Sequence, residues 1–385
     1  MPQKPKVVII GPAHPLRGGL ASYDERLARE FMKEGYDTFI YTFSLQYPGF
    51  LFPGTTQFSS EPAPADLQIR IRINSINPIN WIRIGNELKN LCPDIVVVRY
   101  WLPFMGACLG TIIRRLKKNH SSRVVCIADN VIPHEKRPGD KMLTKYFLRA
   151  PDAFITMSEK VLADLKQFQP GKKAQFVAHP LYDNFGEPIS KSEARQHLNL
   201  PQQERIILFF GFIRKYKGLD ILLEAMKILK EDNDPAIRAI KLLVAGEFYE
   251  NEKPYLDQVA SLDIADSLLL RTSFIPDSEV RNYLCAADCV IQPYRSATQS
   301  GVTPLAYHFE KPMIVTRVGG LPALVPDGKV GWVAEPNAAA IAEAIKKFYA
   351  VGEDRFLNGL REEKLKYSWK SMVNAIVELA NPLIG

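Results

Sequence analysis

Apolar and polar positions alternate in two ways along the first half of the chain. Short apolar runs such as "KVVIIG" and "DIVVVRYW" have the length and composition of buried strands. Between them lie stretches such as "SYDERLAREFMKEG", in which Tyr23, Leu27, Phe31 and Met32 are expected to fall on one helical face. The runs "DTFIYTFS", "IRIRIN", "SRVVCIAD", "DAFITMS" and "AQFVAH" continue the series. Strands separated by such helices predict a parallel sheet that helices cover on both faces.

The second half repeats this plan without repeating the sequence. Its strand-like runs are "RIILFFGF", "IKLLVAGE", "SLLLRTSF", "CVIQPY", "PMIVTRV" and "GWVAEP". Residues 179–204, between the halves, are polar, contain three prolines and show no strand pattern, so we predict a linker there. The chain is therefore predicted to be α/β, with two doubly wound Rossmann-like domains that bind ligands at the carboxyl ends of their strands.

Length and charge set limits on this picture. A chain of 385 residues, with 46% hydrophobic and 24% charged residues, suits two globular domains. No apolar run is long enough to cross a bilayer and the first residues lead directly into a strand, so a cytoplasmic location is expected. The five cysteines form no CxxC pair and are expected to be reduced. The formal charge of +7 favours anionic partners: a nucleotide, nucleic acid or an anionic membrane face.

Two loops of the second half combine cations with free backbone amides. Arg214, Lys215 and Lys217 precede a helix, although a helix N-terminus favours anions over cations, and this conflict suggests a bound polyanion. The small polar residues 298–301 precede another helix, which Thr303 helps to open, and offer backbone N–H groups to an anion. A diphosphate held between the cations and this helix start explains both loops.

Two loops of the first half give weaker evidence for a binding site. Gly18 and Gly19 precede a helix and would let the backbone approach a phosphate or sugar, but taken alone they favour a plain strand-to-helix turn, and G-x-G-x-x-G spacing is absent. Asp129, Asn130 and His134 follow a strand. A lone histidine is often a hydrogen-bonded structural residue. Because His134 follows the carboxyl end of a strand, a role in a functional site is the competing interpretation.

Longer segments resemble a known family. They are "RGGLASYDERLAREFMKEGYDT", "FFGFIRKYKGLDILLEAM", "LLVAGE", "FIPDSEVRNYLCAADCVIQPYRSATQSG" and "KPMIVTRVGGLPALVPDGKVGWVAEP". In this order they are similar to the retaining GT-B glycosyltransferases of the glycosyl transferases group 1 (family 4) type, which take sugar from a nucleotide sugar. The resemblance spans most of the chain and is strongest in the second half.

The resemblance implies a GT-B fold with a deep interdomain cleft. Residues 1–182 and 367–385 would form an acceptor-binding domain whose last helix, from Trp369, crosses back, and residues 183–366 would bind the donor. It implies a metal-independent hexosyltransferase without cofactors. The substrates would be a nucleotide-diphosphate sugar and a glycan or lipid-linked acceptor, in polysaccharide or cell-surface glycan biosynthesis.

The resemblance also assigns roles to residues. Lys217 and Arg214 would hold the donor diphosphate and, with Asp129, form the catalytic set. The implied acceptor-binding residues are Trp101, Asn130 and His134. The implied donor-binding residues are Gly18, Gly19, Arg214, Lys217, Gly246, Glu247, Thr298, Gln299, Ser300, Gly301, Val302 and Thr303.

The chain departs from the family pattern at two places. The family often has two glutamates eight positions apart near the small-residue loop, and here neither position holds a carboxylate. Sugar and ribose contacts are then expected from Gln299, Thr303 or Glu310, while Asp129 stands where the family often has a sugar-facing histidine. The glutamate positions hold Ala297 and Leu305, or Thr298 and Ala306, depending on the alignment.

Two other functions compete with transfer. A catalytically degenerate GT-B protein would bind a sugar nucleotide or a partner without turnover, which the missing glutamates favour and the retained cations oppose. Nucleic-acid binding would rest on net charge alone, without a recognised module or aromatic residues among the basic ones, so we expect no nucleic-acid partner.

A membrane contact is the last expectation. Residues 44–65 hold apolar side chains among prolines and glycines, and residues 110–120 form a basic, helix-like stretch. Together they predict peripheral contact with an anionic membrane, and the alternative is a loop packed on its own domain beside a solvated helix. The residues concerned are Tyr47, Phe50, Leu51, Phe52, Arg114, Arg115, Lys117 and Lys118.

Overall fold

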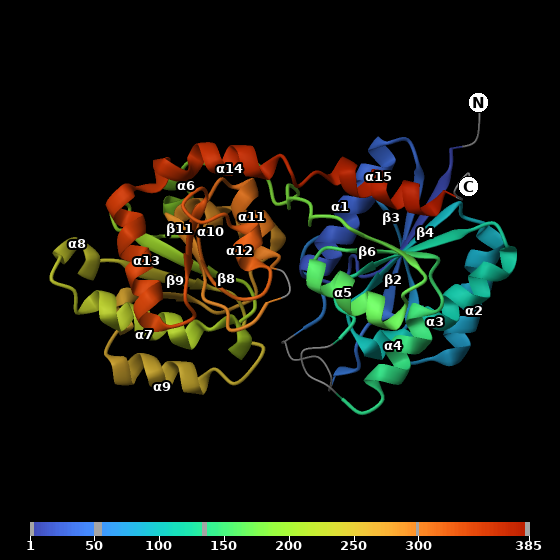
Figure 1. Ribbon diagram of the computed structural model, residues 1–385, viewed down its shortest axis with the longest axis horizontal. Helices are drawn as coiled ribbons and strands as arrows, with labels where there is room; N and C mark the ends of the chain where they lie inside the picture. Colours follow the sequence, from blue (N-terminus) through green and yellow to red (C-terminus); the bar gives the residue numbers. More distant parts are fainter. Residues whose placement is uncertain (1–3, 50–55, 133–136, 298–299, 382–385) are drawn as a thin grey trace. The chain divides into compact units, whose positions relative to one another are not determined.

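The computed structural model describes residues 4–49, 56–132, 137–297 and 300–381. The chain divides into two compact units, one formed by Met1–Pro180 with Ser368–Gly385 and the other by Leu181–Tyr367. Each unit has a sheet of its own, surrounded by helices (Figure 1).

The first unit contains a seven-stranded sheet in the order β3-β2-β1-β4-β5-β6-β7. All its strand pairs are parallel, as predicted. The order reverses between β1 and β4, which is the switch point of a doubly wound sheet. The strands are β1 (Lys6–Ile10), β2 (Asp37–Leu45), β3 (Gln68–Asn74), β4 (Ile95–Tyr100), β5 (Arg123–Ala128), β6 (Ala153–Thr156) and β7 (Lys173–Phe176).

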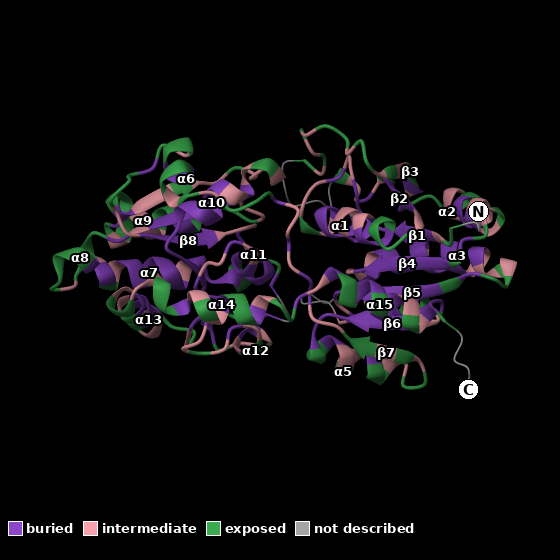
Figure 2. Ribbon diagram, turned by 90° about the horizontal axis from the view of Figure 1, so that it is seen from above, coloured by how far each residue is buried: buried purple, intermediate pink, exposed green. Residues whose placement is uncertain are grey.

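Helices cover both faces of this sheet. Apolar side chains of α2, α3 and α4 form one core with the strands, and α1 and α15 pack on each other at the other face, where α15 contacts β4, β5 and β6. Every residue of β4 is buried as a result, as Figure 2 shows for the central strands. The helices are α1 (Gly19–Lys33), α2 (Pro78–Leu91), η2 (Pro103–Met105), α3 (Gly106–Leu116), η3 (Lys117–Asn119), α4 (Asp140–Leu148), α5 (Glu159–Phe168) and α15 (Trp369–Ala380).

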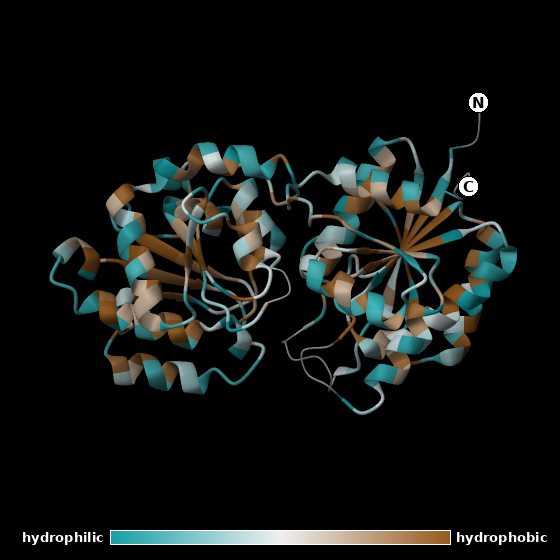
Figure 3. Cartoon of the chain, in the orientation of Figure 1, coloured by the Kyte–Doolittle hydropathy of each residue, from teal (hydrophilic) through white to brown (hydrophobic). Residues whose placement is uncertain are grey.

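The second unit contains a six-stranded parallel sheet in the order β10-β9-β8-β11-β12-β13. Its switch point lies between β8 and β11. Figure 3 shows apolar strands inside and polar helix surfaces outside in both units. The strands are β8 (Ile206–Phe210), β9 (Lys241–Ala245), β10 (Leu268–Arg271), β11 (Cys289–Gln292), β12 (Met313–Thr316) and β13 (Gly331–Ala334).

One helix of the second unit corrects the predicted linker. Helix α6 lies within residues 179–204, where Ser190 and Glu193 form a capping box, and it packs on α10. Among the described helices of either unit, none is long and apolar enough to cross a membrane. The helices of the second unit are α6 (Lys191–His197), η4 (Lys215–Lys217), α7 (Leu219–Lys230), α8 (Pro235–Arg238), α9 (Lys253–Leu262), η5 (Ala265–Ser267), η6 (Asp277–Glu279), α10 (Val280–Ala286), α11 (Val302–His308), α12 (Leu321–Leu324), α13 (Ala338–Val351), η7 (Glu353–Phe356) and α14 (Leu357–Lys364).

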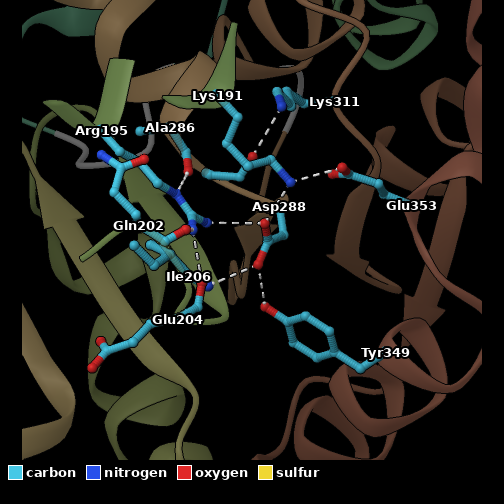
Figure 4. A network of polar contacts seen from close by, with 11 residues as sticks. Lys191, Arg195, Gln202, Glu204, Ile206, Ala286, Asp288, Lys311, Tyr349 and Glu353 are labelled. Carbon is cyan, nitrogen blue, oxygen red and sulfur yellow. Dashed lines mark hydrogen bonds and ion pairs between the residues drawn. The ribbon is translucent and has the colours of Figure 1, made fainter. Parts of the chain in front are cut away.

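Asp288 joins four elements at the amino end of this sheet (Figure 4). Its Oδ1 accepts hydrogen bonds from Lys191 Nζ at 2.7 Å and Arg195 Nη2 at 3.1 Å. Its Oδ2 accepts from the Ile206 amide at 2.8 Å and the Tyr349 hydroxyl at 2.9 Å. One mostly buried carboxylate thereby connects α6, the first residue of β8, the start of β11 and α13. Four donors satisfy a charge whose burial would otherwise be unfavourable.

Asp288→Ala should lower the free energy of unfolding by about 3–5 kcal/mol, because Arg195 would stay buried without its carboxylate partner. Urea denaturation measures the change. Glu353→Gln is the matched control, because Glu353 binds Lys191 at 2.7 Å but is only partly buried, and it should cost less than about 1 kcal/mol. Equal costs for the two variants would contradict the central role of Asp288.

Candidate functional site

The carboxyl edge of the second sheet is built around closely approaching backbone. Gly246 follows β9 with φ 146°, and a Cβ placed on it would lie 2.3 Å from the carbonyl oxygen of Gly211, which follows β8. Only glycine fits at Gly246, so the two loops touch through their main chains. A Cβ placed on Gly211 would lie 3.1 Å from Lys217 Nζ and 3.8 Å from Val302 Cγ2. The structure therefore brings the Lys217 turn and the start of α11 together.

Lys217 ends the 3₁₀ helix η4 and is only 9% exposed. Its Nζ lies over the Tyr294 ring, 5.8 Å from the centroid. Burial lowers the pKa of Lys217 to about 8, with a smaller effect from the charge of Arg214. Across the described residues, no carboxylate oxygen lies within 4.0 Å of Lys217 Nζ. A buried ammonium without a counter-charge is costly, and a bound anion would offset that cost.

Arg214 immediately precedes η4 and adds a second cation. Its guanidinium lies over the Tyr249 ring, 5.3 Å from the centroid. It too lacks a carboxylate within 4.0 Å in the part of the chain that the structure describes. Two cations without counter-charges so close together make a site for a group with more than one negative charge.

The start of α11 lies beside these cations. Tyr294, whose ring supports Lys217, is 3.2 Å from Ser300 Oγ through its hydroxyl, and Ser300 Oγ accepts a hydrogen bond from the Val302 amide. Gly301 is the N-cap residue. The predicted donor-binding residues Thr298 and Gln299 lie outside the described residues. Cations and a helix start thus share one edge of the sheet, as the sequence predicted.

Two side chains expected to replace the missing glutamates have partners inside the unit. Thr303 is 1% exposed and donates its hydroxyl to Gln292 Oε1 at 3.2 Å. Glu310 lies beyond the other end of α11 and forms ion pairs with Arg361 and Lys364. These bonds correct the expectation that Thr303 or Glu310 is available to a sugar or ribose.

The first unit places a charged cluster at the carboxyl edge of its sheet. Arg99, the fifth residue of β4, donates from Nε to Asp129 Oδ2 at 2.6 Å and from Nη2 to Asp129 Oδ1 at 2.7 Å. Its Nη1 lies 3.5 Å from Asp24 Oδ1 of α1. All three side chains are at most 7% exposed. Asp129 is therefore paired with arginine through both oxygens, where the sequence predicted contact with sugar or acceptor.

Asp24 is the incompletely hydrogen-bonded member of this cluster. Its Oδ2 is buried and has no hydrogen-bond partner within the described part of the chain, and it would lie 2.1 Å from a Cβ on Gly11. The pKa of Asp24 is raised to about 8, mainly by burial; the charge of Arg99 opposes the rise and that of Asp129 adds to it. The carboxyl group therefore holds a proton at neutral pH, and Arg99 with Asp129 forms the ion pair.

One aromatic ring links this cluster to the places where the chain leaves and re-enters the unit. The Arg99 guanidinium lies 3.9 Å from the centroid of Tyr23. That ring meets His179 edge-on at 5.1 Å and packs on Trp369 at 4.8 Å. His179 is the second-last residue before the first crossing and Trp369 is the second residue after the return crossing. Burial lowers the pKa of His179 to about 3, so the imidazole is neutral.

The remaining predicted residues of the first unit lie at the same edge. Gly18 has φ 99° and is the N-cap residue of α1, whereas Gly19, predicted to precede the helix, is its first residue. Trp101 follows β4 and donates its indole N–H to the Tyr47 hydroxyl. Asn130 follows Asp129 and is partly buried, whereas His134 lies outside the described residues.

Sequence reasoning missed Arg99, Asp24, Tyr249 and Tyr294. A signal existed for the first, because an arginine inside the apolar run "DIVVVRYW" must be paired when the strand is buried. The tyrosines carried no signal, because aromatic residues near strand ends are usually core residues.

Comparison with known proteins identifies relatives over most of the chain. Residues 190–356 match the family model "Glycosyl transferases group 1", and residues 17–180 match "Glycosyltransferase Family 4". The D-inositol 3-phosphate glycosyltransferase of Saccharomonospora viridis is 28% identical over 267 residues, which are 67% of this chain and 56% of that protein. The D-inositol 3-phosphate glycosyltransferase of Thermobifida fusca is 26% identical over 338 residues, which are 82% of this chain and 76% of that protein.

A relative from Bacillus subtilis, the putative teichuronic acid biosynthesis glycosyltransferase TuaC, is 24% identical over 68% of this chain and 62% of its own. The chain thus spans between about half and three quarters of the length of these relatives. Sucrose-phosphate synthase from Thermosynechococcus elongatus has the same fold, with a TM-score of 0.74, 17% identity and 98% of each chain covered. Anabaena HepE in complex with UDP and glucose gives a TM-score of 0.71, with 13% identity and 97% and 98% of the two chains covered. The predicted fold class, GT-B, is confirmed.

Asp24→Asn should remove one source of pH dependence. Between about pH 4 and 8 the native protein keeps a proton on Asp24 that the unfolded chain has released, so this group's contribution to stability falls as the pH rises. The unfolding free energy of the variant, relative to wild type, should therefore increase across this range by up to about 1.4 kcal/mol per pH unit. Urea denaturation at several pH values measures it. A difference independent of pH would show that Asp24 is ionised in the native state.

Proposed function

Since the chain belongs to the GT-B glycosyltransferases of the glycosyl transferases group 1 type, we propose that it moves a hexose-type sugar from a nucleotide-diphosphate sugar to a glycan or lipid-linked acceptor, with retention of configuration. The observation that carries the proposal is the pair Arg214 and Lys217, two cations without carboxylate partners in the described structure, beside the start of α11. A donor diphosphate supplies the negative charge that this arrangement lacks.

The proposed chemistry is electrostatic. The bond between the sugar anomeric carbon and the phosphate oxygen breaks, and the acceptor oxygen bonds to that carbon on the same face. The acceptor proton passes to the departing phosphate oxygen. Lys217 and Arg214 stabilise the charge that develops on the diphosphate, and at 4 Å and an effective dielectric of 20 each charge pair is worth about 4 kcal/mol before desolvation. A helix start contributes only about 0.3–1 kcal/mol, so the side chains dominate.

Asp129 is proposed to hold the loop after β5 in place, because its two oxygens bind Arg99. This fixes the backbone position of Asn130, the next residue, whose side chain is proposed to contact the acceptor or the transferred sugar. The other proposed contributors keep the roles given by the resemblance. They are Gly18, Gly19, Gly246, Glu247, Ser300, Gly301 and Val302 for the donor and Trp101 for the acceptor.

For the membrane contact, the structure favours α4 over the predicted stretch 110–120. On α3 and its extension, Arg114 stacks on Tyr146 at 3.9 Å and Lys117 pairs with Asp152 at 2.5 Å. The predicted loop residue Tyr47 bonds to Trp101 within its own unit, and Phe50, Leu51 and Phe52 lie outside the described residues.

Helix α4 presents cations and apolar groups on one outer face. Met142 is 69% exposed and Tyr146 is 38% exposed. Lys141, Lys145 and Arg149 flank them at helical spacing, are exposed, and have no carboxylate within 4.0 Å in the described chain. Anionic lipid headgroups complement these charges, and the Met142 side chain would enter the interface. We propose a cytoplasmic protein that contacts an anionic membrane through α4.

One observation favours the alternative, binding without turnover. Thr303 and Glu310, expected to serve in place of the missing glutamates, are bonded inside the unit. Release of free nucleoside diphosphate from a panel of sugar nucleotides in the presence of candidate acceptors separates the two functions, because only a transferase or a donor hydrolase releases it.

Lys217→Met should weaken binding of nucleoside diphosphates by about 10- to 100-fold at neutral pH, since a charged hydrogen bond contributes about 1.5–3 kcal/mol. Wild-type affinity should fall by up to tenfold per pH unit above about pH 8, because the bound state requires a protonated Lys217, and the variant should lack this dependence. Calorimetry with UDP, GDP, ADP and TDP measures both effects, with the nucleosides as references.

Lys215→Met is the matched control for this experiment. Lys215 lies on the same turn but is exposed, and its removal should change the affinity far less. If wild type prefers none of the diphosphates over its nucleoside, or if Lys217→Met binds as wild type does, the donor site lies elsewhere.

Lys141→Glu combined with Lys145→Glu should reduce binding to phosphatidylcholine vesicles that contain phosphatidylglycerol by roughly tenfold or more, because each basic residue near the surface contributes about 1 kcal/mol. Co-sedimentation measures it, with pure phosphatidylcholine vesicles as the reference. Lys160→Glu combined with Lys166→Glu changes the net charge equally and should have little effect, since both lysines belong to a different helix, α5. Equal losses in the two double variants would show attraction by net charge alone.

A further inference from the structure

Three aromatic rings form a stack beside Arg214. Tyr249 stacks on Phe212, with centroids 4.1 Å apart and planes 28° apart. Phe212 lies near-parallel to Phe274, with centroids 6.4 Å and planes 25° apart. Phe212, the middle ring, follows β8, while Tyr249 follows β9 and Phe274 follows β10, so the stack joins the loops at the carboxyl ends of three adjacent strands. Its three members come from different loops, and each limits the movement of the next.

The Arg214 guanidinium lies over the Tyr249 end of this stack, at 5.3 Å. In the described structure the arginine has no carboxylate partner, and Glu250, next to Tyr249 in sequence, accepts a hydrogen bond from the Tyr255 hydroxyl instead. The ring is therefore the contact that orients the guanidinium. Tyr249 could not slide away without disturbing Phe212.

An aromatic ring holds a cation differently from a carboxylate. A carboxylate would neutralise the arginine and compete with an incoming phosphate, whereas the ring face attracts the cation through its quadrupole and leaves its full charge. Other arginines of the same unit are neutralised in pairs, such as Arg317 with Glu335 and Arg361 with Glu310. Lys217 repeats the arrangement of Arg214, over Tyr294 at 5.8 Å.

We infer that Tyr249, backed by Phe212 and Phe274, is a positioning residue that holds the Arg214 guanidinium in place for the donor diphosphate while leaving its charge available. The inference rests on the proposed function, since it assigns a diphosphate to Arg214. It extends that function by naming how the arginine is held without a counter-ion. The same rings could instead stack on the nucleobase of the donor, and the experiment below decides between the two uses.

The test is a double-mutant cycle between Tyr249→Leu and Arg214→Ala, read by calorimetry. The ligands are the nucleoside diphosphate that wild type binds best and its nucleoside. Tyr249→Leu should raise the Kd of the diphosphate by roughly 2- to 30-fold, the range of cation–π contacts, and leave the Kd of the nucleoside unchanged. In the Arg214→Ala background the same substitution should have no further effect. Tyr249→Phe keeps the ring and should bind within about twofold of wild type, because the ring face holds the cation.

Trp332→Leu is the matched control. Trp332 of β13 lies under the Lys347 ammonium, at 3.6 Å, so this variant removes a cation–π contact of the same unit that the proposed site does not use. It should bind the diphosphate as wild type does. Thermal unfolding of each variant verifies that the second unit is folded, and Tyr249→Phe gives a folded comparison should Tyr249→Leu be unstable.

Each possible outcome supports or overturns the inference. Equal weakening of nucleoside and diphosphate by Tyr249→Leu overturns the inference in favour of base stacking. An undiminished effect in the Arg214→Ala background overturns it in favour of a general packing role, and so does loss of binding in Tyr249→Phe. Normal binding by Tyr249→Leu also overturns it. In these cases the donor site itself stands, because wild type still binds the diphosphate, whereas absence of diphosphate binding in wild type overturns both the inference and the proposed function.

Discussion

The second unit is organised around one constraint: it holds positive charge that is removed from water and has no carboxylate counter-charge among the described residues. Lys217 is buried, its pKa is lowered, and no carboxylate neutralises it in the described structure. Such an arrangement is unfavourable for folding and survives only where the surrounding structure holds it. The glycine contacts between Gly246 and Gly211, the Tyr294 ring and the start of α11 are the surroundings that enclose it.

The two edges of the same sheet show opposite treatments of charge. At the amino edge, Asp288 accepts four hydrogen bonds and closes a network in which the cations have partners. At the carboxyl edge, Arg214 and Lys217 rest on tyrosine rings. The first arrangement stabilises the unit, and the second leaves electrostatic potential for a ligand. The carboxyl edge is also where parallel sheets of this kind bind their ligands.

The sequence was sufficient to predict what depends on local pattern. Apolar runs such as "KVVIIG" and "DIVVVRYW" became strands, and glycine with cations marked loops at the strand ends, so the fold class and the positions of Lys217 and Gly18 followed. Contacts between distant segments could not be predicted in this way. Arg99 meets Asp129 thirty positions away, and Tyr249 meets Phe212 from another loop. Such pairs depend on strand order, which hydrophobic periodicity does not specify.

The linker shows a different limit. Its prolines and polar residues suggested irregular chain, yet "SKSE" is a capping box, and the short helix that it begins is stabilised by packing on α10 and by the bonds of Arg195 to Ala286 and Asp288. A helix of seven residues has little stability of its own. Tertiary contacts decided its existence, and these lie nearly a hundred positions away.

The path of the chain also determines the order in which the molecule can be completed during synthesis. The second unit is one continuous segment, Leu181–Tyr367, whereas the first is interrupted by it and receives α15 only afterwards. Trp369, Met372 and Ile376 of α15 are buried against the face of the first sheet that includes β4, β5 and β6. As synthesis proceeds, the part of that face that α15 covers stays exposed while the whole second unit is made. The second unit is free to fold during this time. Of the two units, the one that begins earlier in the chain is therefore completed later, and its exposed apolar surface must be kept from aggregating until α15 emerges.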